Sequence, residues 1–318
     1  MPLIPNSNNN SSNNQTKVPQ KQELQFNKSA PIYTFADLIL SENTMDELQT
    51  VVSAQKNWKK VFIDWGLGTV MKERKNLFVN LYGSSGTGKS MSAHAIAAAL
   101  DKKLICVNYA DIESKYVGET SKNLSRLFND PSNKDDIIFF DEADALLSKR
   151  VTDMSSATDV SVNQTRSVLL TLLNSYEGMV IFATNFISNY DSAFMRRIHY
   201  HIRFELPNEE LREKLWKHYI PSQMPVEADI HKMAKDYTGL SGSDISTAVM
   251  KAALNAAKND ANIVSDKDLK FAVESIIASK KANTGLAKQV ITKSEIVDEK
   301  DVPQSIREKT NKTEVSIK

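Results

Sequence analysis

The sequence predicts an α/β fold in which a five-stranded parallel sheet lies between two layers of helices (a three-layer αβα domain), followed by a small all-helical lid domain. Two observations lead to this prediction. Short, nearly continuous apolar runs alternate with helical patterns up to about residue 206, and beyond Pro207 only helical patterns remain. Strands that are apolar on both faces are typical of a parallel sheet covered by helices on both sides.

The five expected strands are short runs of apolar and β-branched residues. They lie at 77–82, 104–107, 137–140, 179–183 and 201–204. Between them, an Ala-rich segment at 89–100 and a Leu-rich segment at 164–175 have the periodicity of helices. The helices of the lid domain are expected near 208–219, 227–237, 241–259 and 265–282.

Composition divides the chain into four parts. Residues 1–30 are rich in Asn and Ser, and residues 284–318 are polar and mixed in charge. Neither segment has enough apolar side chains to offset the entropy of ordering, so both are expected to be disordered tails. The α/β domain is then expected at 31–206 and the helical lid at 207–283.

The overall composition excludes several classes of protein. The 318 residues include 40 Lys plus Arg against 39 Asp plus Glu, so the net charge of +1 gives no general field for nucleic acid or anionic lipid. Cys106 is the only cysteine, which excludes an internal disulfide and a cysteine-based metal cluster. No apolar run approaches the ~18 residues that a membrane span needs. These features predict a soluble, cytoplasmic protein of a reducing compartment.

A glycine-rich loop directly after the first expected strand has the pattern of a phosphate-binding loop. It reads Gly83-Ser84-Ser85-Gly86-Thr87-Gly88-Lys89-Ser90 and opens the first long helix. Glycines allow backbone N–H groups to close around a phosphate chain, and the helix N-terminus adds partial positive charge. We expect Lys89 to reach the β- and γ-phosphates of ATP and the Ser90 hydroxyl to bind Mg²⁺. The alternative is a Gly/Ser turn that merely precedes a helix.

A second motif lies at the end of the strand expected at 137–140, which runs into Asp141 and Glu142. Ligands of open α/β sheets bind at the carboxyl ends of the strands, so these carboxylates are expected beside the phosphate-binding loop. Asp141 is the candidate for holding Mg²⁺, and Glu142 for accepting a proton from the attacking water. Taken alone, Asp-Glu after a strand is also common in solvated turns. Together, the two motifs predict a P-loop NTPase.

From roughly residue 33 to residue 282 the sequence resembles the AAA family of ATPases. The strand that ends Ala183-Thr184-Asn185 is similar to the sensor-1 strand of that family, which implies that Asn185 contacts the γ-phosphate or the attacking water. The segment ending Met195-Arg196-Arg197 resembles the one that carries the arginine finger, although the usual Pro-Gly between the arginines is absent. Arg197 aligns with the finger and Arg196 is the second choice. Two surface arginines paired with acids are the alternative.

The resemblance extends to a pore loop and to adenine contacts. Tyr116-Val117-Gly118 resembles the aromatic–hydrophobic–Gly loop with which protein-translocating AAA rings grip a polypeptide, although an aromatic residue here could also belong to the core. For the adenine ring, the resemblance implies contacts from Asp37 and Leu38 before the first strand, and from Gly242 and Ser243 at the start of a lid helix.

The resemblance therefore implies an ATP-hydrolysing ring, with six subunits in the presence of ATP, that remodels, unfolds or disassembles protein substrates through its central pore. Two alternatives stay open at this point. One is a nucleic-acid-associated ATPase of clamp-loader or helicase-loader type, which would need a basic channel. The other is a monomeric P-loop kinase, which would leave Asn185 and Arg197 without a role. The expected cofactors are ATP and Mg²⁺, and the five histidines show no metal-ligand spacing.

Overall fold

The computed structural model describes residues 26–71, 76–108, 119–149, 157–185 and 190–291. Its main sheet has six strands in the order β1-β3-β4-β5-β2-β6. The five expected strands are all present, and each is one residue longer than the predicted run. They are β2 (Leu77–Gly83), β3 (Leu104–Asn108), β4 (Ile137–Asp141), β5 (Met179–Thr184) and β6 (Tyr200–Phe204).

The strands β3, β4 and β5 pair in parallel, which confirms the mostly parallel sheet. Ile138 lies opposite Ile105 on one side and Val180 on the other. All five residues from Met179 to Ala183 are buried, as expected for a strand that is covered on both faces. Parallel pairing brings the carboxyl ends of these strands to one edge of the sheet, where Asp141 and Thr184 lie.

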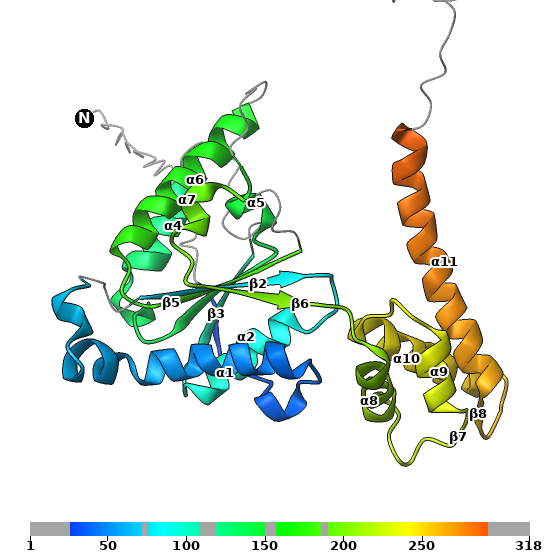
Figure 1. Cartoon of the computed structure of the whole chain (residues 1–318). Helices are drawn as coiled ribbons and strands as arrows, with labels where there is room; N and C mark the ends of the chain where they lie inside the picture. Colours follow the sequence, from blue (N-terminus) through cyan, green and yellow to red (C-terminus); the bar gives the residue numbers. More distant parts are fainter. Residues whose placement is uncertain (1–25, 72–75, 109–118, 150–156, 186–189, 292–318) are drawn as a thin grey trace, which may run out of the picture. The chain divides into compact units, whose positions relative to one another are not determined.

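Helices cover both faces of the sheet (Figure 1). They are α1 (Glu42–Lys56), α2 (Lys89–Ala99), α4 (Glu119–Asn129), α5 (Asp144–Leu147), α6 (Ala157–Ser175) and α7 (Ser192–Met195). On one face, apolar side chains of α4 and α6 such as Leu124 and Leu169 pack with Phe140 and Phe182 of the sheet into one core. The rings of Phe140 and Phe182 stack, with 5.4 Å between their centroids.

The lid helices are α8 (Glu209–Tyr219), α9 (Ile230–Asp236), α10 (Gly242–Lys258) and α11 (Asp266–Ile291). They enclose a core of their own around the fully buried Trp216. The prediction that this part is purely helical was wrong in one detail. Two-residue strands, β7 (Val226–Glu227) and β8 (Val264–Ser265), pair in parallel. Such short pairs carry no periodic signal, because they form only when the loops that contain them are brought together.

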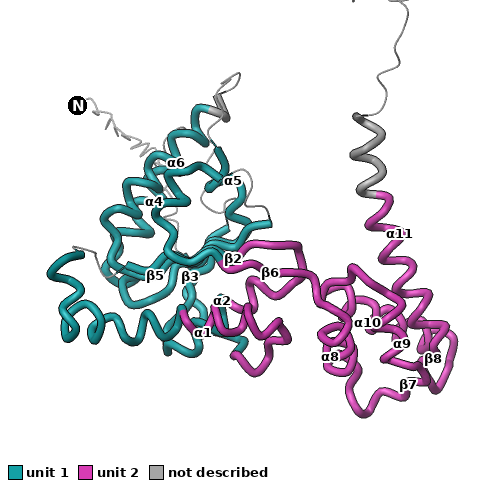
Figure 2. Tube along the Cα trace, viewed as in Figure 1, with its two compact units in different colours: residues 1–34, 51–81, 93–201 teal, residues 35–50, 82–92, 202–318 magenta. Residues whose placement is uncertain are grey.

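By their contacts, the residues group into two compact units (Figure 2). The first comprises residues 1–34, 51–81 and 93–201, and the second comprises residues 35–50, 82–92 and 202–318. The boundary expected near residue 206 stays a prediction, since this grouping by contacts does not test it. The glycine-rich loop groups with the lid helices because it touches them, for example through the Ser243 N–H, which donates to the Gly86 carbonyl at 3.2 Å.

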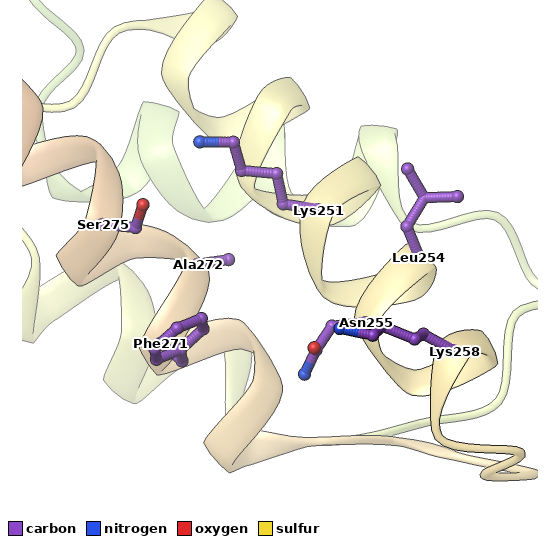
Figure 3. Close-up of a pocket in the computed structure, with 7 residues that line it drawn as sticks. All are labelled: Lys251, Leu254, Asn255, Lys258, Phe271, Ala272 and Ser275. Atoms are coloured by element: carbon purple, nitrogen blue, oxygen red, sulfur yellow. The ribbon is translucent and has the colours of Figure 1, made fainter.

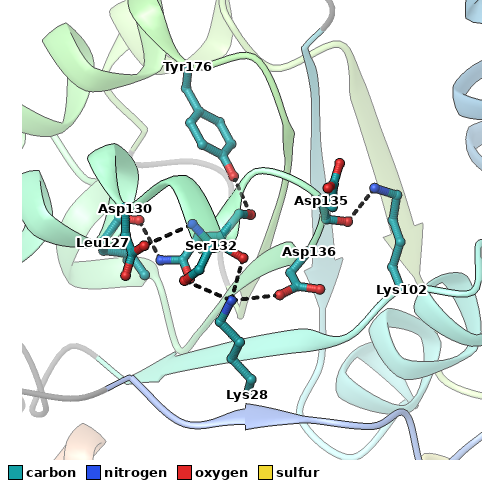
Figure 4. Close-up of polar contacts among 9 residues, drawn as sticks. Lys28, Lys102, Leu127, Asp130, Ser132, Asp135, Asp136 and Tyr176 are labelled. Carbon is teal, nitrogen blue, oxygen red and sulfur yellow. Dashed lines mark hydrogen bonds and ion pairs between the residues drawn. The ribbon is translucent and has the colours of Figure 1, made fainter.

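The expected disordered tail at 1–30 was wrong at its C-terminal end. Lys28–Ser29 forms β1, which pairs antiparallel with β3. The Lys28 ammonium lies 2.9 Å from the Asp136 carboxylate and 3.2 Å from the Ser132 hydroxyl (Figure 4). A polar segment is ordered here because its backbone completes the edge of the sheet and its lysine finds fixed acceptors, neither of which composition reveals.

The C-terminal boundary needs a similar correction, since α11 continues to Ile291, beyond the limit expected near residue 284. Residues 292–318 lie outside the described part of the chain, as do residues 1–25. Within the described residues, no helix is long and apolar enough to cross a membrane.

Candidate functional site

The glycine-rich loop follows β2 and leads directly into α2. Three of its residues adopt positive φ angles that favour glycine: Gly83 at 144°, Gly86 at 74° and Gly88 at 103°. The buried Lys89 turns its ammonium back into the loop, where it donates to the carbonyls of Gly83 at 2.8 Å and Ser84 at 3.0 Å. The Thr87 hydroxyl donates to the same Ser84 carbonyl at 2.7 Å. The loop is therefore a closed turn with a cation at its centre.

The start of α10 packs directly against this loop. A Cβ atom at Gly86 would lie 2.7 Å from Ser241 Oγ and 2.7 Å from Ser243 Cβ, so only glycine fits there. Ser241 caps α10 by accepting the Asp244 N–H, while the Asp244 carboxylate accepts the Ser241 N–H in return. Gly242 and Ser243 were predicted to be near the nucleotide base. The structure places both beside the phosphate-binding loop.

The cap of α10 is stabilised by charge. Lys280 of α11 pairs with the Asp244 carboxylate. Burial disfavours ionisation of Asp244, but the hydrogen bonds from Lys280 and Ser241 outweigh it and hold the pKa of the carboxyl below its ordinary value. At neutral pH the cap therefore carries a negative charge at the helix N-terminus, where it is favoured.

The segment at 35–40 lies in the same unit as the loop. Asp37 ends the short helix η1 (Phe35–Asp37) and is exposed, whereas Leu38 is buried. Leu40 lies against the loop, because a Cβ on Gly88 would be 3.5 Å from its Cδ2. Ile39 packs on the core of the lid helices. Leu40 was not among the predicted contacts, and a leucine in a polar segment gives no signal of its own.

In the other unit, the end of β4 carries the two predicted acids. Asp141 is partly buried, and its Oδ1 accepts the Glu142 N–H at 3.0 Å. Glu142 has a φ angle of 51°, in the left-handed region that side chains other than glycine seldom adopt, and its side chain is exposed. Such a conformation costs about 1 kcal/mol. This left-handed conformation makes the chain turn at Glu142, directly after β4.

Asn185 follows the last residue of β5, and its backbone is held by Asp144. The Asn185 N–H lies 3.1 Å from each carboxylate oxygen of Asp144. The structure therefore links the predicted sensor residue to the acidic segment after β4. Asp144 was not among the predicted site residues. Its place three residues after Asp141 is the one signal that could have suggested it.

The two predicted arginines follow α7 and differ in their surroundings. Arg197 is partly buried, and its guanidinium donates to the Asn174 side chain at 2.7 Å and to the Ala193 carbonyl at 2.7 Å. Arg196 is exposed, and its Nε donates to the Ser192 carbonyl at 3.2 Å. Neither guanidinium is deep in the protein, so both can meet a second molecule.

The remaining predicted site residues, Tyr116, Val117 and Gly118, lie outside the described residues. Ser85 and Ser90 belong to the loop described above and are exposed and partly buried, respectively.

The residues present fit a nucleotide. The loop glycines and the Lys89 ammonium suit a phosphate chain at the N-terminus of α2, and the oxygen atoms of Ser90 and Asp141 are of the type that Mg²⁺ prefers. Among the described residues, no cluster of three or more His, Cys, Asp or Glu side chains could hold a metal by itself.

A separate hollow of about 330 Å³ lies between α10 and α11 (Figure 3). Phe271 and Leu254 line it and are 65% and 64% exposed. Lys251 and Lys258 also line it, and none of the residues that line it is a carboxylate or an imidazole. It therefore lacks the acid and base groups that the strand ends provide.

Comparison with known proteins identifies the relatives of this chain. The model of the family described as "ATPase family associated with various cellular activities (AAA)" matches residues 79–206, which include the loop, both acids, Asn185 and both arginines. The proteasome-activating nucleotidase of Methanopyrus kandleri is 33% identical over 215 residues, which are 65% of this chain and 49% of that protein.

Two further relatives are similar to this chain to about the same degree and also have names that refer to proteasomes. The proteasome-activating nucleotidase of Aeropyrum pernix is 32% identical over 209 residues, 63% of this chain and 51% of that protein. A protein of Methanocaldococcus jannaschii, named as a homologue of a 26S proteasome regulatory subunit, is 30% identical over 255 residues, 78% of this chain and 65% of that protein. The chain thus spans between about half and two thirds of the length of these relatives.

Proposed function

The chain belongs to the AAA family of ATPases, and we propose that it hydrolyses ATP as one subunit of a ring that remodels or unfolds protein substrates. The observation that carries this proposal is the glycine-rich loop, closed around Lys89 and packed against the start of α10. A loop held in this way presents backbone N–H groups and an ammonium to a phosphate chain, and keeps the residues at 241–244 beside the same ligand.

The roles of the binding residues follow from their chemistry. Lys89 exchanges its carbonyl acceptors for phosphate oxygens, which are stronger partners because they are charged. Ser90 and Asp141 would supply oxygen ligands for Mg²⁺, which when bound would neutralise negative charge on the phosphates. Gly242, Ser243, Asp37 and Leu38 are the proposed contacts of the adenine ring, since all four share a unit with the loop.

Hydrolysis needs a base and a group that orients the water. Glu142 is the proposed base, because its exposed carboxylate follows directly after Asp141 at the end of the strand. Asn185 is the proposed orienting group, and Asp144 fixes its backbone. A positively charged group must also approach the γ-phosphate, and we propose that α7 supplies it to the neighbouring subunit. Arg196 is better exposed for this role, whereas Arg197 first has to leave Asn174.

Two observations support the proposal that this chain remodels or unfolds protein substrates. The names of the three relatives described above refer to the activation or regulation of proteasomes, which degrade proteins. Tyr116, Val117 and Gly118 supply the aromatic–hydrophobic–Gly sequence that would contact an extended polypeptide in a pore. A ring of six subunits is the assembly that we propose for this task.

The test replaces Glu142 by Gln, which removes the base and keeps the size of the side chain. We expect ATP hydrolysis to fall by about 10²-fold or more while ATP still binds. We also expect ATP to hold the variant in a hexamer, seen by light scattering after gel filtration. The matched control is Glu177→Gln, which removes the same charge from an exposed glutamate outside the site.

Hydrolysis at the wild-type rate by Glu142→Gln would refute the assigned mechanism. A monomer at every ATP concentration, for both the wild type and the variant, would refute the ring.

A further inference from the structure

Three polar side chains form a buried cluster inside the otherwise apolar core of the sheet. Asn80 of β2, Thr184 of β5 and Tyr190 are 0%, 1% and 5% exposed. The Tyr190 hydroxyl contacts Thr184 Oγ1 and lies 3.3 Å from Asn80 Oδ1, which also lies 3.3 Å from Thr184 Oγ1. All three side chains belong to the same compact unit.

This cluster is unfavourable for stability compared with an apolar core. The Nδ2 of Asn80 is buried, and among the described residues it has no hydrogen-bond partner. Burial also raises the pKa of Tyr190 far above its ordinary value, so the hydroxyl stays protonated and acts as a donor. Leucine and phenylalanine at these positions would avoid the unpaired amide. Stability therefore does not explain the presence of these three polar side chains, which points to a functional role.

The position of each member indicates that role. Thr184 directly precedes Asn185, whose backbone is held by Asp144. Tyr190 directly precedes Asp191, which caps α7 by accepting the Ala193 N–H at 2.8 Å, and α7 leads to the two arginines. The hydroxyl of Tyr190 thus joins the end of β5, which precedes Asn185, to the start of α7, which precedes the two arginines.

The backbone around Tyr190 is also tied to the acidic segment. Tyr190 forms a bridge with Ser148, and the Asp191 N–H donates to the Leu147 carbonyl at 2.9 Å. Leu147 and Ser148 end α5, which begins at Asp144. A shift of Tyr190 would therefore displace Asn185, α5 and α7, because each is linked, by hydrogen bonds or along the chain, to residues 190–191 or to Thr184.

We propose that Tyr190 is a positioning residue for ATP hydrolysis: its hydroxyl, bonded to Thr184 and Asn80, holds Asn185 and the arginine-bearing helix in one fixed arrangement. This inference rests on the proposed function. In the proposed role, Tyr190 does not contact the nucleotide. Its effect is on the geometry of groups that do, and small displacements of such groups slow a reaction strongly.

The first experiment uses the full chain with Tyr190→Phe, which removes one oxygen atom and keeps the ring. We expect kcat for ATP hydrolysis to fall ~10-fold while the Kd for ATP changes less than ~2-fold, since only the hydrolysis geometry is lost. Thr184→Val breaks the same contact from the other side and should give a similar loss. Because both variants remove the same contact between the two hydroxyls, the loss in the double variant should be smaller than the sum of the two single losses.

The matched control is Tyr176→Phe. Tyr176 is also 5% exposed, and burial raises its pKa to about 12. Its hydroxyl lies 3.5 Å from the Asn133 carbonyl, among the contacts around Ser132 that Figure 4 shows, and not beside Asn185. Tyr176→Phe should therefore keep the wild-type kcat, whatever it does to the midpoint of thermal unfolding.

Equal losses of kcat in Tyr190→Phe and Tyr176→Phe would overturn the proposal, since the effect would then be a general loss of stability. An unchanged kcat in Tyr190→Phe, or losses that add fully in the double variant, would overturn it too. If Tyr190→Phe does not fold, Thr184→Val gives the decisive measurement. Wild-type hydrolysis by Glu142→Gln would instead refute the proposed function itself, so the two failures are distinguishable.

The second experiment tests the link to the arginine-bearing helix. Wild-type subunits are mixed with Glu142→Gln subunits, which do not hydrolyse ATP and serve as arginine donors, and then with Glu142→Gln/Tyr190→Phe subunits. We expect the rate per wild-type subunit to be lower in the second mixture, approaching a ~2-fold loss at equal proportions, because about half of the wild-type subunits then have a variant neighbour as the arginine donor. Equal rates in the two mixtures would overturn the link to α7.

Discussion

The contact between Gly86 and the start of α10 can be tested by replacing Gly86 with alanine. Gly239 provides a matched control, because its backbone has nearly the same conformation. Gly86 has a φ angle of 74° and Gly239 has a φ angle of 75°. A Cβ at Gly86 would lie 2.7 Å from both Ser241 Oγ and Ser243 Cβ, whereas at Gly239 nothing lies within 4 Å. Replacing each glycine by alanine imposes the same backbone strain but a clash only at Gly86.

The magnitudes can be worked out from these two positions. Alanine in the left-handed region costs about 1 kcal/mol at either site. The clash at Gly86 adds about 1–3 kcal/mol, as overpacking usually does. Rotation of Ser241 cannot relieve it cheaply, because the same oxygen caps α10 and because Ser243 Cβ is fixed to the backbone. The native loop is thus disfavoured by a further factor of about 5 to 150 in Gly86→Ala.

The assay is the Kd for ATP, measured by calorimetry, together with the free energy of unfolding in denaturant. We expect Gly239→Ala to lose about 1 kcal/mol of stability and to keep its Kd. Gly86→Ala should weaken ATP binding by about 5- to 150-fold, because the loop must leave its binding conformation. If both variants bound ATP equally well, the loop would not need its contact with α10, and the reasoning would be refuted.

Three further predictions follow from other contacts. Arg196→Ala should abolish ATP hydrolysis in the proposed ring while each subunit still binds ATP, and Arg197→Ala should do so only if Arg197 leaves Asn174. Mixing each variant with Lys89→Ala subunits shows which arginine acts on a neighbour. Lys28→Met should lower the free energy of unfolding by about 1 kcal/mol, because the contacts with Asp136 and Ser132 are lost, and an unchanged denaturation curve would contradict this. The hydrogen bond that His231 donates to the Glu213 carboxylate, followed by the charge of that carboxylate, raises the pKa of His231 above 6.5. This pair therefore stabilises the fold below pH 6.5 and loses its effect as the pH rises through the raised pKa. The advantage of wild type over His231→Gln in thermal unfolding should shrink as the pH rises, and a constant advantage would rule the pair out.

Much of the fold could be predicted because burial on both faces leaves a strong pattern. All five main strands lie where the apolar runs predict them, from Leu77 to Phe204. The strand β1 was missed, since a pair such as Lys28–Ser29 has no apolar pattern and is ordered only by its partners.

The candidate site shows the same limit. The spacing of Gly83 to Ser90 is informative because the chemistry of phosphate binding restricts those positions. The roles of Asp144 and Tyr190 were not predictable, because each acts through a partner distant in sequence, Asn185 for the first and Asn80 for the second. Predictions for Tyr116 to Gly118 stay predictions, since those residues lie outside the described part of the chain.

The sequence alone determined the order of the elements and the chemistry of the loop, since both depend on which residues are neighbours along the chain. Only the tertiary structure decided that Gly86 lies against Ser241 and Ser243, and that one tyrosine hydroxyl joins the end of β5 to the segment before α7. The physical reason is that hydrogen bonds and close packing act over a few ångströms. Residues many positions apart come within that range only after the chain has folded.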